Sequence, residues 1–227
     1  MTAITAPRRQ THRDLLARLR EVMAAPSGRV VLVNVPMGNF LMVDGTGAAG
    51  EEELASAVRA LTDLSAAVRL YLQEGCDDLL DPMPVEILWS PPDDDAWHEA
   101  MPGEWSWTAM VGQPAAVTPQ LVTAVRDSQL LRGEQPGDAI RRAMGRVRLG
   151  SLREGICAQT AYAGHAERSQ SVLARLLDHV RAMGYEPHGP HHEIYVADLR
   201  HAEAAPLRTV VRQPIRRLAW PEQGLPQ

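Results

Sequence analysis

The chain has 227 residues, a length that fits one large domain or two small fused halves. Because 45% of the residues are hydrophobic and 22% charged, the chain can bury a sizeable core and is not a disordered tail. Its formal net charge of −5 argues against a surface that coats nucleic acid, and we expect no direct nucleic-acid partner. All 23 basic residues are arginine, and the lack of lysine excludes Schiff-base chemistry and a Walker-type phosphate loop.

The cysteines and the hydropathy pattern favour a cytoplasmic protein. Cys76 and Cys157 are far apart and form no CxxC pair, so neither a disulfide framework nor a zinc knuckle is expected. No apolar run approaches the ~20 residues of a membrane span, and the first residues lack the apolar core of a signal peptide. We therefore expect no membrane partner; the sequence indicates no oligomeric state.

In the first half, residues 1–28 are predicted to form a helical extension, because leucine and valine recur at helical spacing within an arginine-rich stretch. Residues 28–36 and 39–45 are predicted as two strands separated by a Pro-Met-Gly-Asn turn. A long amphipathic helix over 51–73 follows, then strands over 84–89 and 105–113. Thr118 and Pro119 begin a helix that ends near Gly133.

The second half repeats this order. A strand over 153–164 precedes a helix that ends at Gly184, and strands over 192–198 and 207–214 follow. In both halves a Glu-Ile strand follows the long helix, and the next strand ends in Gln-Pro. We predict an α+β domain over 29–220, made of pseudo-repeats 29–133 and 146–217. Each repeat is a β-α-β-β unit, and together they form an antiparallel sheet with helices on one face and a central ligand groove on the other.

Strand alternation predicts which side chains line this groove. Ile194 and Val196 share one side of their strand, which we expect to lie against the helices. Glu193 and Tyr195 then face the groove, and Glu86 does so by the repeat symmetry. The two carboxylates are expected at matching positions, where burial and mutual repulsion would raise their pKa values.

Tryptophan is concentrated in one short stretch of this aromatic-poor chain, at Trp89, Trp97, Trp105 and Trp107. Such residues can form flat walls for a planar or cationic ligand. The alternative for each tryptophan is a position in the core. The alternative for each glutamate is a solvated strand end.

The segment HGPHH contains His188, His191 and His192, but it lacks a helical i, i+4 pair and a further ligand cluster. We expect a loop that leads into a strand, and no metal site. The sequence also has no GxSxG elbow, glycine-rich phosphate loop or Cys-His arrangement, so no cofactor is expected.

Six segments resemble motifs of the GyrI-like small-molecule-binding domain family, in order and at compatible spacing, over roughly residues 30–217. They read NVPMGNFLMVDG, PVEILWS, WSWTAMVGQP, ICAQTAYAG, GPHHEIYVADLR and LRTVVRQP. The resemblance implies a duplicated β-α-β-β fold with a central ligand groove. Some members of the family are effector domains fused to helix-turn-helix regulators, and some modulate gyrase. Some free-standing members hydrolyse the cyclopropane of DNA-alkylating antibiotics of the yatakemycin and duocarmycin class. Since no convincing DNA-binding unit is evident here, the resemblance implies drug hydrolysis or drug sequestration.

The preferred hypothesis is a cofactor-independent hydrolase that opens such a cyclopropane by adding water and thereby protects the cell. Glu193 is the candidate base, Glu86 its partner, and Tyr195 a donor to the carbonyl oxygen of the drug. The alternative is a non-catalytic protein that sequesters or senses an aromatic or cationic ligand, with the glutamates as counter-charges. The predicted ligand-binding residues are Trp89, Trp105, Trp107, Tyr162, His165, Phe40 and Tyr71.

Overall fold

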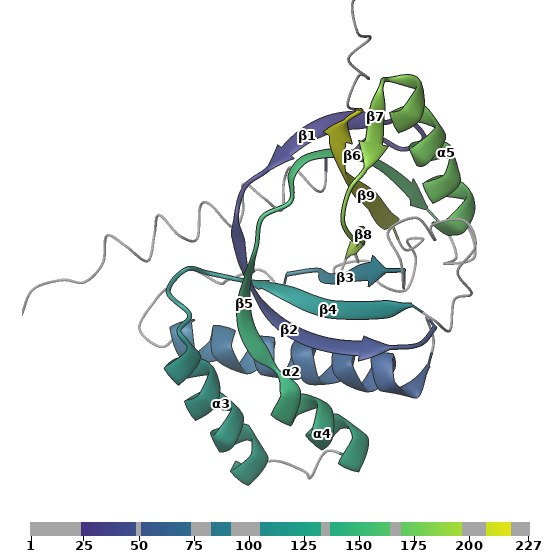
Figure 1. The fold of residues 1–227 in the computed structure, drawn as a ribbon. Coiled ribbons are helices and arrows are strands. Elements are labelled where there is room, and N and C mark those ends of the chain that lie inside the picture. Colours follow the sequence, from purple (N-terminus) through teal and green to yellow (C-terminus); the bar gives the residue numbers. More distant parts are fainter. Residues whose placement is uncertain are drawn as a thin grey trace, which may run out of the picture.

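Figure 1 shows the computed structural model, which describes residues 24–48, 51–73, 83–91, 105–132, 137–163, 169–196 and 208–218. Within these ranges a nine-stranded antiparallel sheet carries four helices, so the predicted α+β class is confirmed. None of the described helices combines the length and apolarity needed to cross a bilayer. In chain order the elements are β1 (Val31–Val35), β2 (Gly38–Thr46), α2 (Glu52–Gln73), β3 (Val85–Ser90), β4 (Ser106–Gln113), α3 (Pro119–Arg132), α4 (Asp138–Arg146), β5 (Arg148–Leu152), β6 (Gly155–Ala163), α5 (Ser169–Ala182), β7 (Tyr185–Pro187), β8 (His191–Val196) and β9 (Arg208–Arg217).

The two predicted β-α-β-β units are present. The first is β1 and β2, α2, β3 and β4, and the second is β5 and β6, α5, β7 with β8, and β9. The central pair of the sheet is β3 from the first unit and β8 from the second, with Ile87 opposite Glu193. Helices α3 and α4 connect the units; α4, β5 and β7 are not among the elements that the sequence predicts.

The sheet curls because two long chain segments, 31–46 and 148–163, pair with each other over 31–42 and 148–159. Its strand order is β1-β6-β9-β8-β3-β4-β2-β5, with β7 on β9. Only two residues separate β1 from β2, and only two separate β5 from β6. β1 pairs with β6 and β2 with β5, so the predicted turn at 36–39 does not reverse the chain. The strand order therefore begins and ends, at β1 and β5, in the same two paired segments (Figure 1).

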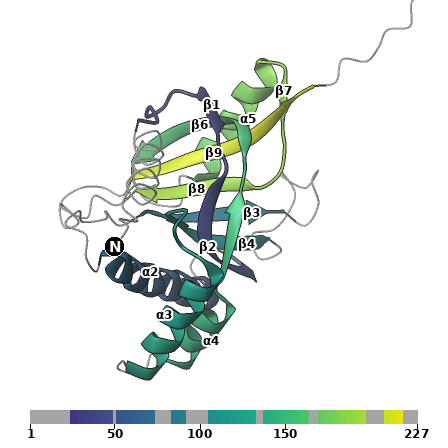
Figure 2. The same cartoon turned by 90° about the vertical axis from the view of Figure 1, so that its left-hand side faces the viewer.

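Both long helices lie on one face of the sheet, as predicted. The apolar stripe of α2, with Leu61 and Leu64 fully buried, packs on Val43 and Val111 of β2 and β4. Helix α5 packs through Leu176 and its neighbours on β6 and β9, and Figure 2 shows α5 above and α2 below the central strands β8 and β3. Each fully buried leucine contributes about 1.5–3 kcal/mol through removal of apolar surface from water.

The opposite face of the sheet, which we call the inner face, holds a polar layer between two apolar ones. One apolar layer contains Ile194 and Val196, so the prediction that these two side chains lie against the helices is wrong. The polar layer is formed by Glu86, Glu154, Gln159, His192 and Arg212, and the second apolar layer by Phe40, Met42, Leu88, Met110 and Leu152.

The ends of several elements follow local rules. Thr118 caps α3 as predicted, since its Oγ1 accepts a hydrogen bond from the Leu121 amide at 3.2 Å. Gly184 follows α5 with a φ of 79°, which favours glycine at a helix end. Of the predicted N-terminal extension, residues 1–23 lie outside the described residues. Its last part contacts the sheet, where the Gly28 amide donates to the Ala161 carbonyl at 3.1 Å.

Candidate active site

The candidate site lies on the helix-bearing face, on the strip of sheet between the two helices, so the prediction that Glu193 and Tyr195 line a groove on the face opposite the helices is wrong. Helix α2 packs on β2 and β4 and α5 on β6 and β9, so the central strands β3 and β8 lie between them. Alternation along β8 places His191, Glu193 and Tyr195 on this face. Trp89 joins them because it pairs with His191 across the two central strands.

The Glu193 carboxylate is the centre of this cluster and is only 7% exposed. Trp89 Nε1 donates a hydrogen bond to Glu193 Oε2 at 3.3 Å, and the Tyr195 hydroxyl donates to the same oxygen. His191 Nε2 lies 3.5 Å from Glu193 Oε1. The carboxylate is therefore held by side chains from both repeats, with Trp89 from the first and Tyr195 from the second.

The electrostatics of the cluster keep Tyr195 protonated. Burial raises the pKa of the Tyr195 hydroxyl, and the adjacent Glu193 carboxylate raises it further. A neighbouring tyrosine, Tyr162, acts in the same direction. The site thus pairs the buried carboxyl group of Glu193 with a phenol that keeps its proton at neutral pH and can donate a hydrogen bond.

The prediction that Glu86 and Glu193 occupy matching positions on one face is wrong. In the register of β3 and β8, Glu86 is opposite Ile194, whereas Glu193 is opposite Ile87. Adjacent strand residues point to opposite faces, so the repeat alignment that matched the two glutamates is one residue out of step with the strand pairing. Glu86 is 1% exposed on the inner face, with Oε2 3.1 Å from His192 Nε2.

Among the predicted tryptophans, Trp89 donates a hydrogen bond to the candidate base. Trp107 is 2% exposed within the core beneath α2, where its ring lies directly against Gly45. Trp105 is partly buried against the same core. Trp107 thus follows the alternative stated for the tryptophans, a position in the core.

The remaining predicted ligand-binding residues are dispersed. Tyr162 is close to the site, since it pairs with Thr209, which in turn pairs with Tyr195. Phe40 is fully buried on the inner face, so the prediction that it lines the same site as Glu193 is wrong. Tyr71 is 53% exposed near the end of α2. His165 lies outside the described residues.

Sequence reasoning missed two features. His191 was assigned to a loop, although its position two residues before Glu193 in an alternating strand would have placed it on the same face. The second is the set of charges in the polar layer, which we call the buried ion network: Glu86, Glu154, His192 and Arg212. It could not be found from sequence, because its members come from four separate strands or connections.

In the buried ion network, Glu154 is the central acceptor. Its Oε1 lies 2.8 Å from His192 Nδ1, and its Oε2 accepts a hydrogen bond from Arg212 Nη1 at 2.8 Å. Burial alone would raise the pKa of Glu154, but His192 and Arg212 outweigh burial and lower the pKa to about 2. For His192 burial also disfavours the charged form and would lower the pKa, but Glu154 and Glu86 raise it. Both partners are thus favoured in their charged forms.

The histidine segment is divided by the sheet. His191 projects to the helix-bearing face and His192 to the inner face, so the two cannot ligate one metal ion together. In the part of the chain that the structure describes, no group of three or more metal-ligating side chains is placed to hold a metal ion.

Comparison with known proteins finds similarity at the level of structure. No family model matches the chain, and no curated protein matches its sequence. The structure superposes on an uncharacterized conserved protein from Listeria innocua with a TM-score of 0.72 and 25% identity, over 88% of this chain and 98% of that one. A hydrolase encoded by lin2189 from Listeria innocua gives a TM-score of 0.68 and 24% identity, with the same coverage.

A third similar structure is the C-terminal domain of EcmrR, with a TM-score of 0.51 and 9% identity over 84% of this chain and 98% of that domain. The shared property is the fold. These similarities are consistent with the GyrI-like family that the motifs resemble.

Proposed function

We propose that the chain is a cofactor-independent hydrolase that adds water to a small, planar electrophile at the Glu193 cluster. The observation that carries the proposal is the nearly buried Glu193 carboxylate, which accepts hydrogen bonds from Trp89 and Tyr195. A base held in one orientation by two donors needs little reorganisation when it takes a proton. The fold shared with the hydrolase from Listeria innocua supports the same class of reaction.

The substrate class that we propose is a cyclopropane conjugated to a dienone, as in DNA-alkylating antibiotics of the yatakemycin and duocarmycin type. Such a ring is strained and opens when a nucleophile attacks its methylene carbon. The motif resemblance and the aromatic Trp89 and Tyr195 beside the carboxylate support this choice, since flat aromatic groups bind planar ligands well. The biological role would be self-resistance or detoxification.

In the proposed reaction, Glu193 takes a proton from a water molecule while the water oxygen forms a bond to the methylene carbon. The strained carbon–carbon bond breaks, and its electron pair passes through the dienone to the carbonyl oxygen. Tyr195, whose raised pKa keeps it protonated, is assigned as the donor that stabilises this oxygen: once Glu193 has taken the proton of the water, the Tyr195 O–H turns from Glu193 Oε2 to the carbonyl oxygen. The proton held by Glu193 then returns, through solvent, to the phenolate, so that the product is a phenol with one added water.

The test is mass spectrometry of a cyclopropane-bearing alkylator incubated with a substoichiometric amount of protein. A hydrolase converts the excess drug to the ring-opened, water-added phenol. Glu193→Gln keeps the shape of the side chain and removes the base, so turnover should fall by at least about 100-fold. Protection that saturates at about one drug per protein, with the drug recovered intact, would instead indicate sequestration and overturn the proposal.

Glu86→Gln is the matched control, because it changes the other buried glutamate of the central strand pair. Glu86 points to the inner face, so this variant should lose stability but keep its turnover per folded molecule. Equal loss of turnover in the two folded variants would contradict the assignment of Glu193 as the base.

A further inference from the structure

The sheet divides at one end, where β6 leaves β9. The two strands pair from Ala163 opposite Arg208 to Cys157 opposite Pro214, and the pairing stops there. Beyond this point β6 stays with β1, and β9 continues with β7 as far as Arg217. Pro214 has no amide hydrogen to donate to a ladder, which suits the position where the strands separate.

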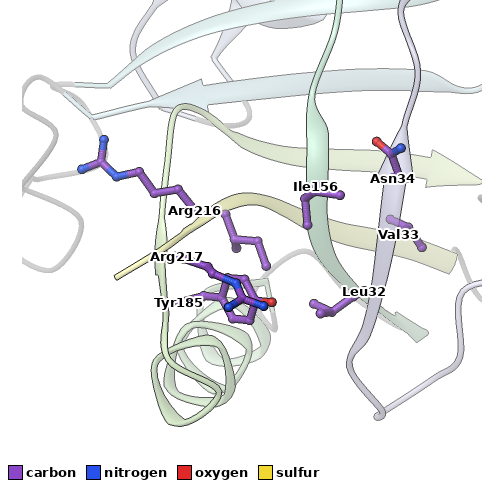
Figure 3. Close-up of a pocket in the computed structure, with 8 residues that line it drawn as sticks. Leu32, Val33, Asn34, Ile156, Tyr185, Arg216 and Arg217 are labelled. Carbon is purple, nitrogen blue, oxygen red and sulfur yellow. The ribbon is translucent and has the colours of Figure 1, made fainter. Parts of the chain in front are cut away.

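A cavity of about 470 Å³ lies in this division (Figure 3), within the range of small-molecule sites. Register places its main side chains on the helix-bearing face, at the edge of the core that α5 covers. The cavity shares no residue with the Glu193 cluster. Its lining residues are Leu32, Val33, Asn34, Ile156, Tyr185, Ile215, Arg216 and Arg217.

The apolar part of the cavity is unusually accessible. Leu32 is 44% exposed and Ile156 is 48% exposed, although both lie in paired strands. Ile215 is only 6% exposed and belongs to the core beneath α5, so it forms a fixed floor. A ligand that covers Leu32 and Ile156 would remove this surface from water.

The charged part of the cavity is positive, and its lining contains no acidic residue. Arg216 is neutralised by Glu186, with Nε 2.6 Å from Oε1. The Arg217 guanidinium instead lies over the Tyr185 ring, 5.9 Å from its centroid, and within the described residues it makes no ion pair with a carboxylate. Figure 3 shows Arg217 at the Tyr185 ring, on the Leu32 side of the cavity, whereas the Arg216 guanidinium points elsewhere.

We propose that this cavity is a second binding site, for a small amphipathic monoanion such as an aromatic or alkyl carboxylate or sulfonate. The anionic group pairs with Arg217, and the apolar body covers Leu32, Ile156 and Ile215. One guanidinium that has no ion pair among the described residues, beside an apolar floor, fits a single negative charge better than a polyphosphate. The site thus selects a negatively charged ligand, whereas the Glu193 carboxylate favours positive charge. The inference does not depend on the proposed hydrolase activity.

The test uses the fluorescent probe 8-anilinonaphthalene-1-sulfonate and its neutral counterpart N-phenyl-1-naphthylamine, titrated against the full chain. The sulfonate should bind at one site and at least 10-fold more tightly than the neutral probe. Arg217→Gln should remove this difference. Arg175→Gln, which deletes an exposed arginine on α5, should leave both affinities unchanged. Ile156→Asp, at a half-exposed position that tolerates a polar residue, should abolish binding of the sulfonate while the circular dichroism spectrum stays native.

Three results would overturn the proposal: equal effects of the two arginine variants, no saturable binding of the sulfonate, or loss of its binding in Glu193→Gln. A second copy of the chain is the competing occupant. Self-association that Ile156→Asp breaks, together with no binding of the probe, would assign the cavity to that contact and also overturn the proposal.

Discussion

Replacing Glu154 by glutamine tests whether the buried ion network stabilises the fold. Glu154 holds two cationic partners on the inner face, where its side chain is 2% exposed and that of Arg212 is 3% exposed. Glutamine keeps the volume and can still accept the Arg212 hydrogen bond, but it removes the negative charge. The amide nitrogen facing His192 Nδ1 then favours a neutral histidine that accepts a hydrogen bond, because a protonated ring would place two donors against each other.

The size of the effect follows from the pKa of Glu154. A carboxyl whose pKa falls from 4.5 to about 2 on folding contributes on the order of 3 kcal/mol at neutral pH. Removing one partner of a buried ion pair costs about 3–5 kcal/mol in comparable proteins, since the remaining charge stays buried. We therefore expect Glu154→Gln to lower the free energy of unfolding by about 3 kcal/mol at pH 7.

The pH dependence follows from the directions of the two shifts. Because the folded pKa of Glu154 lies below its ordinary value, its contribution is complete above pH 4.5 and is lost as the pH falls toward 2. Because the folded pKa of His192 lies above 6.5, its contribution is complete below that pH and is lost as the pH rises through the raised value. The wild-type chain should lose stability on both sides of this window, and Glu154→Gln should have a flatter acid limb.

Urea unfolding between pH 3 and 9, followed by tryptophan fluorescence and circular dichroism, measures both effects. Asp63→Asn is the matched control, because the Arg59–Asp63 pair has the same 2.8 Å separation as the Glu154–Arg212 pair but is exposed. That variant should unfold like wild type within error. If Glu154→Gln also unfolds like wild type at pH 7, or keeps an equally steep acid limb, the assignment of stability to the buried ion network is refuted.

Three further predictions concern single side chains. Gly45→Ala should destabilise the fold by about 1–3 kcal/mol, measured by thermal unfolding, because a Cβ there would lie 2.2 Å from the Trp107 ring; unchanged stability would mean that the ring moves freely. Cys157 should resist iodoacetamide in the native chain, followed by peptide mass spectrometry, because burial first and then a nearby carboxylate raise its pKa to about 12; rapid native alkylation would contradict this. Trp89→Phe removes the Nε1 donor to Glu193 but keeps a flat ring, so kcat should fall more than the affinity for the drug; a change in affinity alone would show that the donor has no part in the reaction.

Much of the architecture could be predicted because its signals are local. The stripe along α2, the Thr118 cap and the glycine after α5 each depend on residues a few positions apart. The order of strands and helices in the two halves was enough to predict the duplication, and the neighbouring Glu193 and Tyr195 were correctly placed on one face together.

The sequence alone determined the α+β class, the repeat of β-α-β-β units and the placement of Glu193 and Tyr195 on one side of their strand, since period and spacing are properties of single segments. Only the tertiary structure decided which face of the sheet each strand presents to the helices. A shift of one residue in strand register moves a side chain from one face to the other without changing the local pattern. That shift separated Glu86 from Glu193, whereas the packing and pairing of distant segments placed Phe40 on the inner face and brought Glu154, His192 and Arg212 together.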